Sequence, residues 1–417
     1  MSIRKRIAII GSGISGLSAA YYLKDTWDIT LFEKDSRLGG HSRTIKINND
    51  FDVDTGFIVL NDRTYPLLIK LFTDLNIALS KTEMSFSISA NQGQLEWSGT
   101  SLDSLFAQRK NIFNFSMLKG IYDIVKFNSN AVSMVKNYPL ITLRELIYEM
   151  RLGDWFKNYY ILPMGGAIWS CSLKVMLDFP AATFVKFFEN HGLLNIMNRP
   201  QWYTLKDKSI SYVKILEFEI NKKGKIIRNA KIESISRKNS IVKISCAGKI
   251  ADSFDQVIFA IHPEEILKIL TDPTLDEKNI LAKFSRQKNI AYTHADTNQM
   301  PRLNKCWSSW NYLYEKNIEK HNVSVTYWMN KLQHIEQKFP LFVTLNPIEK
   351  IAEDKLFDVY EFYHPIYNNN SIIASQELEK LQGSNYAWFC GAYLCYGFHE
   401  DGIASAVNIL DKMDKSK

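Results

Sequence analysis

The sequence predicts an α/β protein with a discontinuous Rossmann-type domain and a second, α+β domain in which helices cover an antiparallel sheet. Three separated stretches, residues 1–75, 222–270 and 375–417, place short β-branched runs beside helical periodicity. The stretches between them differ: 76–221 is mainly helical, and 271–374 is rich in aromatic strand patterns. We therefore expect the three outer pieces to form one nucleotide-binding domain and the two insertions to form a substrate domain.

The first stretch opens with a dinucleotide-binding fingerprint in its expected context. The apolar run Ile7–Ile10 is typical of a buried strand, and it leads into a glycine turn before the helix predicted over Leu17–Lys24. The first glycine permits the tight turn, the second lets the backbone approach a pyrophosphate, and the third allows close helix packing. Free N–H groups at the helix start favour phosphate. The expected phosphate site is Gly11, Ser12, Gly13, Ile14, Ser15 and Gly16.

A second predicted strand, Asp28–Phe32, ends in Glu33, twenty positions after Gly13. At this spacing a carboxylate accepts hydrogen bonds from an adenosine ribose. The same acid disfavours a phosphorylated ribose, and therefore NADP. The following residue, Lys34, is also expected beside the cofactor.

A second glycine turn makes FAD, rather than NAD, the expected cofactor. Gly39 and Gly40 permit another close backbone approach, and Arg43 is expected to neutralise the pyrophosphate. The alternative for this segment alone is a hairpin turn with a surface arginine. The cofactor-binding residues expected in this region are Gly39, Gly40, His41, Ser42, Arg43, Thr55, Gly56 and Phe57.

Together, the turn Gly11–Gly16, Glu33, the Gly39-Gly40 pair, Arg43 and the segment Asp54–Gly56 resemble the flavin amine oxidase superfamily. That superfamily includes phytoene-type desaturases and protoporphyrinogen oxidases. The resemblance implies noncovalently bound FAD on the Rossmann-type domain.

The resemblance also assigns roles to later residues. It implies a strand near Ile232 that reads the adenine and a strand that returns beneath the cofactor to Ala260. It further implies a second helix N-terminus against the flavin ring, with backbone N–H groups facing the ring's pyrimidine edge. The residues assigned to this second site are Gly391, Asp401, Gly402 and Ile403. Cys395 lies near it but lacks the attachment motif of covalent flavin enzymes, so we expect a spectator thiol.

A finer resemblance covers nearly the whole chain. Tyr396–Gly402, Trp307–Tyr312 and Tyr327–Gln333 look like a bacterial subgroup of predicted NAD/FAD-binding proteins, which is linked to enzymes of cyclopropane and methyl-branched fatty acids. A desaturase of furan fatty acid synthesis is similar. This implies a fatty-acyl or phospholipid substrate and a lipid-modifying methyltransferase as partner. The chain departs from the subgroup at Lys206–Ser209, where a glycine-rich turn is expected.

Four residues are candidates for the catalytic end of the site. His399 is either a proton relay or a histidine that only orients its loop. Tyr396 precedes it, and Trp310 and Tyr327 belong to aromatic strands that either line a substrate channel or pack in the core.

The composition further narrows the classes of protein that fit this sequence. The 51 basic and 44 acidic residues are interleaved, which argues against nucleic acid despite the net charge of +7. Five cysteines without a C-x-x-C pair fit a reducing compartment, and no apolar run approaches ~18 residues, so we expect a cytoplasmic protein. The eight histidines show no metal-ligand spacing, and we expect no metal.

Peripheral contact with the inner face of the membrane is a further expectation. The segment Leu105–Phe127 mixes basic and aromatic side chains, so it either lies on an anionic membrane surface or packs on its own domain.

The function predicted from these observations is an FAD-dependent oxidoreductase, a desaturase or oxidase, that takes hydride from an apolar chain. The alternatives are a flavin amine oxidase, which needs an aromatic cage around the amine, and a flavin-binding partner of a lipid-modifying enzyme without turnover. A reductase fed by NAD(P)H is disfavoured, because Met164–Ala167 lacks the strand, helix and acid of a second fingerprint.

Overall fold

A computed structural model describes residues 4–48, 50–169, 173–195, 199–247, 249–315 and 324–415. Its first layer is a parallel sheet whose strands come from three distant parts of the chain. In spatial order they are β10 (Lys225–Ile227), β2 (Asp28–Phe32), β1 (Arg6–Ile10), β14 (Gln256–Phe259) and β20 (Ala387–Phe389). Residues from 1–75, 222–270 and 375–417 thus meet in one sheet, while the exact domain boundaries stay a prediction.

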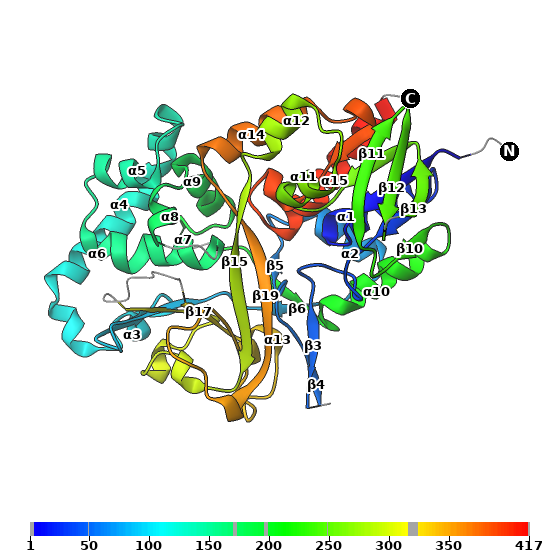
Figure 1. Ribbon diagram of the computed structural model, residues 1–417. Coiled ribbons are helices and arrows are strands. Elements are labelled where there is room, and N and C mark those ends of the chain that lie inside the picture. The colour runs from blue at the N-terminus through cyan, green and yellow to red at the C-terminus, as the bar shows by residue number, and fades with distance from the viewer. Residues whose placement is uncertain are drawn as a thin grey trace.

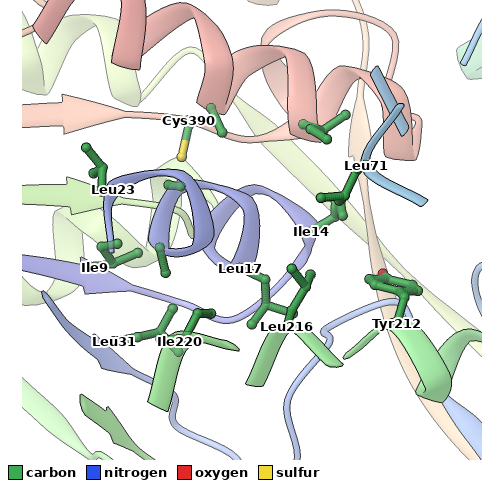
Figure 2. Packing of buried hydrophobic residues seen from close by; sticks show 14 of the residues in the cluster. Ile9, Ile14, Leu17, Leu23, Leu31, Leu71, Tyr212, Leu216, Ile220 and Cys390 are labelled. Atoms are coloured by element: carbon green, nitrogen blue, oxygen red, sulfur yellow. The ribbon is translucent and has the colours of Figure 1, made fainter. Parts of the chain in front are cut away.

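Helix α1 (Ile14–Leu23) crosses one face of this sheet and is enclosed by two other helices, α10 (Lys208–Asn221) and α15 (His399–Lys415). Leu17, Leu216 and Ile220 are fully buried where α1 meets α10, as Figure 2 shows. Helix α10 falls in the stretch predicted for the substrate domain, yet its apolar face completes the core around α1 because that is the face it has to bury.

The second layer is a seven-stranded sheet, antiparallel except where β16 runs parallel to β7. Its order is β19 (Leu356–Ile366), β15 (Ser285–His294), β18 (Phe342–Leu345), β17 (Ser324–Trp328), β16 (Trp310–Tyr314), β7 (Phe86–Ala90) and β8 (Leu95–Ser98). The long pair β15 and β19 runs down the middle of the molecule in Figure 1.

A group of helices lies on the other side of that pair from α1 and α10 (Figure 1). Its members are α4 (Phe115–Asn137), α5 (Leu143–Glu149), α6 (Asp154–Phe156), the π-helical turn η2 (Lys157–Ile161), α7 (Leu162–Trp169), α8 (Leu173–Leu177) and α9 (Ala181–Asn190). They share one apolar core with side chains of the seven-stranded sheet, including Ile88, Tyr312 and Val325. The predicted α/β class with a helix-covered α+β part is confirmed.

The remaining elements are small. The sheets comprise β11 (Ile232–Lys238), β12 (Ile241–Cys246) and β13 (Lys249–Phe254); β3 (Thr44–Ile47) and β4 (Phe51–Asp54); and β5 (Leu60–Asn61), β9 (Trp202–Leu205) and β6 (Leu79–Thr82). The helices are α2 (Pro66–Asp74), α3 (Leu102–Leu105), α11 (Pro263–Ile269), α12 (Leu275–Leu281), α13 (Met329–Gln333) and α14 (Asn369–Glu379). Short 3₁₀ turns span Arg109–Phe113, Thr297–Gln299, Asn304–Cys306, Glu353–Lys355, Ser384–Tyr386 and Ala392–Leu394.

Several local predictions agree with these bounds. The strand predicted over Asp28–Phe32 has the same limits in the structure. The predicted helix over Leu17–Lys24 begins three residues earlier, at Ile14, because Gly13 is its N-cap. The aromatic strand predicted to contain Trp310 begins at that residue, after the 3₁₀ turn Asn304–Cys306 and three irregular residues.

In the parts of the chain that the structure covers, no helix combines the length and the apolar character needed to cross a bilayer.

The glycine turn between β1 and α1 gives a first prediction. A side chain at Gly16 would overlap the carbonyl oxygen of Gly11, which is backbone and cannot move aside. We expect Gly16→Ala to lower the free energy of unfolding by about 3 kcal/mol, the upper range for forced overpacking. Chemical denaturation followed by circular dichroism measures it.

Gly13→Ala is the matched control, because a Cβ at Gly13 meets no atom within 4 Å. Its effect should stay below about 1 kcal/mol, the usual scale for changes at a helix N-cap. Equal losses in the two variants would show that the close approach at Gly16 is not what limits stability.

Candidate functional site

One cavity of about 920 Å³ runs from the glycine turn of the parallel sheet to the aromatic residues of the seven-stranded sheet. Most of the residues predicted for the site line its wall. They are Gly11, Ser12, Gly13, Ile14, Ser15, Glu33, Lys34, Gly40, His41, Thr55, Gly56, Phe57, Ile232, Ala260, Trp310, Tyr327, Gly391, Tyr396 and His399. Segments from both insertions and all three outer pieces therefore meet around one space.

The predicted residues that do not reach the wall are Gly16, Gly39, Ser42, Arg43, Asp401, Gly402 and Ile403. They lie directly behind it. Gly16 packs on Gly11, and a side chain at Gly39 would press on the backbone of Ser42. These positions support the shape of the wall.

The phosphate end is built from backbone and one acid. Gly11 adopts φ +99°, and a side chain there would lie 2.7 Å from the carbonyl oxygen of Ala260. Glu33 is buried, and its carboxylate accepts hydrogen bonds from the N–H of Ser12 at 3.0 Å and the N–H of Asp35 at 2.9 Å. The acid is thereby fixed at the end of β2, on the cavity wall, where the sequence predicts the ribose site.

Arg37, rather than Arg43, presents a guanidinium to the cavity. Arg43 forms a two-pronged ion pair with Asp358, at 2.8 and 3.0 Å, and its guanidinium lies 4.2 Å from the ring centre of Tyr360. Arg37 lines the cavity and donates from Nη2 to the hydroxyl of Tyr360 at 2.8 Å.

The other terminal nitrogen of Arg37, Nη1, is buried and has no hydrogen-bond partner in the structure. A buried charged donor without an acceptor is costly, so this atom is suited to an anionic ligand. Together with the open face of Gly13 and the acid Glu33, it makes the cavity fit a dinucleotide. The sequence contained the signal, since Arg37 stands two residues before Gly39, but the predicted pyrophosphate contact was assigned to Arg43.

A cluster of neutral histidines forms the middle of the wall. Burial lowers the pKa of His41 to about 4 and the pKa values of His364 and His399 to about 3, with further lowering by neighbouring positive charge. The rings of His41 and His364 lie 5.2 Å apart. These imidazoles are uncharged at neutral pH.

His399 is held on several sides. Its Nε2 lies 2.8 Å from the hydroxyl oxygen of Ser42 and 3.2 Å from that of Tyr212, and Phe57 stacks on the ring with centroids 3.8 Å apart. Ser42 and Tyr212 also contact one another. The Nε2 of His399 thus has both hydroxyls as hydrogen-bond partners. This arrangement fits a histidine that orients its surroundings.

The start of α15 supports the cavity from behind. The carboxylate of Asp401 accepts hydrogen bonds from the N–H groups of Phe398 at 2.8 Å and Tyr396 at 3.2 Å, so it shapes the loop that lines the cavity. The N–H of Gly402 donates to the carbonyl of Phe398, the residue just before the helix. A side chain at Gly402 would lie 2.6 Å from Ile14, so this glycine permits α15 to pack on α1.

Ile403 belongs to the apolar core around α1 and is fully buried. The predicted contact of Gly402 and Ile403 with a flavin ring stays a prediction. Glu400, which the sequence did not single out, accepts hydrogen bonds from the N–H groups of Leu67 and Leu68 at 2.8 and 3.0 Å. It therefore caps the N-terminus of α2 from a distant helix.

The far end of the cavity is an aromatic chamber. Trp310 and Tyr327 face each other across β16 and β17, with ring centroids 5.2 Å apart and planes at 84°. Tyr396 and Phe398 contribute from the loop before α15, and Met164, Trp169 and Phe187 come from α7 and α9. We define the aromatic chamber as the part of the cavity lined by these seven residues.

The segment Lys206–Ser209, which has no glycine where the resemblance implies a glycine-rich turn, lies away from the cavity. None of the four lines the cavity. Lys208 adopts φ +62°, the conformation for which a glycine is favoured, and Ser209 donates to the buried carboxylate of Asp54 at 3.0 Å through its N–H. The loop keeps a glycine-like backbone without the glycine.

The other sequence expectations have simple outcomes. Met164–Ala167 is part of helix α7, so it does not form a second dinucleotide turn. Cys395 is exposed and does not line the cavity, and Cys246, Cys306 and Cys390 are free thiols too, whereas Cys171 lies outside the described residues. Over the described ranges, no cluster of three or more metal-ligating side chains occurs.

The two arginines give a second prediction. We expect Arg37→Gln to weaken dinucleotide binding about tenfold or more, because a charge-assisted hydrogen bond to phosphate is lost. Arg43→Gln should leave the affinity within about threefold and lower thermal stability instead, since it breaks the ion pair with Asp358. Calorimetric titration of the apoprotein measures both. If Arg43→Gln weakened binding and Arg37→Gln did not, the pyrophosphate contact would belong to Arg43, as the sequence predicted.

The buried carboxyl of Asp401 gives a third prediction. Burial raises its pKa to about 6, from an ordinary 3.8. The folded state therefore binds the proton more tightly, and Asp401 costs stability as the pH rises from about 4 to 6. We expect the stability of Asp401→Asn relative to the parent to increase by about 3 kcal/mol between pH 3.5 and pH 7. Urea denaturation at both values measures it, and a constant difference would mean an ordinary pKa.

Comparison with known proteins agrees with this geometry. A family model described as an NAD(P)-binding Rossmann-like domain matches residues 9–75. The chain is 49% identical over 45 residues to protoporphyrinogen oxidase 2, chloroplastic/mitochondrial, of Arabidopsis thaliana, which covers 11% of this chain and 9% of that protein. It is 23% identical over 310 residues to coproporphyrinogen III oxidase of Staphylococcus aureus, covering 65% of this chain and 64% of that one. Both matches span less than two thirds of the relative's length.

Solved structures match over the whole chain. The CLA-producing fatty acid isomerase from P. acnes has a TM-score of 0.71 at 14% identity, with 99% of both chains covered. Cyclohexylamine oxidase from Brevibacterium oxydans has a TM-score of 0.67 at 13% identity, covering 99% of this chain and 100% of that one. Residues 9–75 therefore match an NAD(P)-binding Rossmann-like domain, and the chain as a whole shares the fold of these solved structures.

Proposed function

We propose that this protein is an FAD-dependent oxidoreductase that oxidises an apolar substrate, with a fatty-acyl chain as the best candidate. The observation that carries the proposal is the single cavity that joins a dinucleotide cradle to an aromatic chamber. The fold is shared with oxidases of porphyrinogens and amines and with a fatty acid isomerase, so it is compatible with several substrates.

The cradle supports FAD through three features. Glu33 offers a carboxylate at the ribose position and disfavours a 2′-phosphate. Gly13 leaves room for a pyrophosphate, and Arg37 has a buried donor without a partner. When bound, the flavin supplies an acceptor for the two electrons of a C–H bond.

The chamber supports an apolar substrate. The carboxylates on the cavity wall, among the described residues, are Glu33, Asp35, Glu265 and Glu361, and none belongs to the aromatic chamber. A substrate ammonium group in the chamber would therefore lack a carboxylate partner, which makes its burial costly. A hydrocarbon chain needs no such partner and gains from contact with the aromatic walls.

The rings also argue against the closest rival, an amine oxidase. A cage requires two aromatic faces with space between them for the amine. Trp310 and Tyr327 instead touch edge to face, which leaves no slot between the two rings. The other aromatic side chains of the chamber could still make a cation–π contact with an amine. The test therefore includes amines.

Within the site, the protein's own residues hold side chains and backbone in place and exclude water. Ser42, Tyr212 and Phe57 fix His399 as a neutral ring, and Asp401 fixes the backbone of Tyr396 and Phe398. The aromatic walls exclude water from the place where a C–H bond would meet the cofactor.

We also propose peripheral contact with an anionic membrane surface. Leu102, Phe113, Phe115 and Tyr122 on α3, the adjoining 3₁₀ turn and α4 are 67–87% exposed, and Lys119 lies on the same helix as two of them. Gly99 and Thr100, which precede α3, line the cavity, so this surface lies next to a cavity opening. Single exposed apolar residues are ordinary, but four neighbouring aromatic and aliphatic ones beside basic groups fit an interfacial helix.

The test is anaerobic absorbance of the yellow holoprotein mixed with bacterial phospholipid vesicles that carry unsaturated or methyl-branched chains, with a panel of amines as the control. We expect loss of the oxidised flavin band with lipid and not with amines. Loss with amines alone would identify an amine oxidase. No loss with either would favour a flavin-binding partner of a lipid-modifying methyltransferase, and a protein unable to bind FAD would overturn the proposal. Co-sedimentation with the same vesicles tests the membrane contact.

A further inference from the structure

Arg199 is a positive charge on the cavity wall without a counter-charge. It is exposed, it lines the cavity, and its Nε donates to the carbonyl of Asn195 at 3.3 Å. Over the described ranges, no Asp or Glu lies within ion-pair distance of its guanidinium, whereas Arg37 and Arg286 at the dinucleotide end contact Tyr360 or glutamates. Among these residues, no acid competes with an anionic ligand for the charge of Arg199.

The backbone directs Arg199 to this place. Helix α9 ends at Asn190, and Gly192 turns the chain with φ +65°. A side chain at Gly192 would lie 2.9 Å from Pro200 and 3.7 Å from the Cα of Arg199, so the two ends of this short loop are packed together. The loop starts from the helix that contributes Phe187 to the aromatic chamber.

Tyr160 contributes a phenol to the same cavity. It is buried, lines the cavity, and stacks near Trp97, with ring centroids 6.3 Å apart. Burial raises the pKa of Tyr160 to about 12, and the nearby positive charge of Arg199 acts in the opposite direction. Its backbone belongs to the π-helical turn Lys157–Ile161, a distortion that often places a side chain in a functional site. A buried, neutral phenol and an exposed guanidinium thus line the same cavity.

The surroundings make an anion the matching ligand. Leu193, Trp97 and Trp202 line the cavity here and are apolar, and burial lowers the pKa of His191 to about 4, so its ring is neutral at pH 7. Among the described residues, the carboxylates of the wall all lie outside the aromatic chamber. A guanidinium binds a carboxylate or a phosphate through charge-assisted hydrogen bonds.

We propose that Arg199 and Tyr160 form an anion-binding subsite that holds the head group of a single-chain amphiphile, while its hydrocarbon chain lies in the aromatic chamber. The head group is a carboxylate or a phosphate, and both chemistries suit a guanidinium beside a phenol. The inference rests on the proposed apolar substrate. It adds that one end of the substrate's hydrocarbon chain carries a negatively charged head group.

The experiment is isothermal titration calorimetry of the holoprotein at pH 7 with four twelve-carbon probes below their micellar concentrations: dodecanoate, dodecyl phosphate, 1-dodecanol and dodecylamine. We expect dodecanoate or dodecyl phosphate to bind at least about tenfold more tightly than dodecanol, the effect of one charge-assisted contact. The tighter of the two identifies the head group. Arg199→Gln should remove this preference while leaving dodecanol unchanged, and Arg199→Lys should retain part of it.

Two further variants sharpen the result. Tyr160→Phe should weaken the binding of the anionic probe by about threefold, because the variant loses one neutral hydrogen bond. Arg4→Gln removes an exposed charge just before β1, at the parallel sheet, and should leave every affinity unchanged.

The outcomes separate this inference from the proposed function. Equal affinities for dodecanoate, dodecyl phosphate and dodecanol would overturn the subsite and leave the apolar chamber standing. An unchanged preference in Arg199→Gln would also overturn it. Binding of none of the probes would overturn the subsite together with the apolar substrate, and tightest binding of dodecylamine would overturn it in favour of an amine oxidase.

Discussion

The close backbone approach at the glycine turn is the constraint on which the rest of the structure depends. Gly11 meets the backbone that follows β14, Gly16 meets Gly11, and Gly402 meets the first residues of α1. Because these three glycines lack side chains, the helices α1 and α15 and the strands β1 and β14 can pack closely together. The cavity begins there, since the residues Gly11–Ser15 line its wall, and the start of a helix suits a phosphate.

A second constraint links this floor to the aromatic chamber. The buried carboxylate of Asp54, on β4, accepts hydrogen bonds from Ser209 at the start of α10, from Thr44 on β3 and from Gln333 at the end of α13. Burial raises its pKa, and the surrounding donors oppose that rise. One satisfied acid therefore fixes elements of both insertions against the dinucleotide-binding part, which sets the distance between cradle and chamber.

The chemistry available at this site follows from where charge is absent. The five histidines that line the cavity, His41, His191, His262, His364 and His399, are neutral at pH 7 because burial lowers their pKa values. The carboxylates of the wall lie outside the aromatic chamber, and the side chains of the chamber carry no charge. A site of this kind stabilises little charge on a substrate by itself. It is suited to position a chain next to a cofactor that supplies the reactive group.

The sequence by itself determined the β1–α1 turn, the acid after β2 and the α/β class, because these depend on residues adjacent in the chain and on the conformational freedom of glycine. The tertiary structure decided which distant side chains share the cavity. It placed Arg37 at the wall and paired Arg43 with Asp358, and it put Trp310 against Tyr327. Local pattern cannot show this, since the direction of a long side chain is set by partners hundreds of residues away that appear only when the sheets pack.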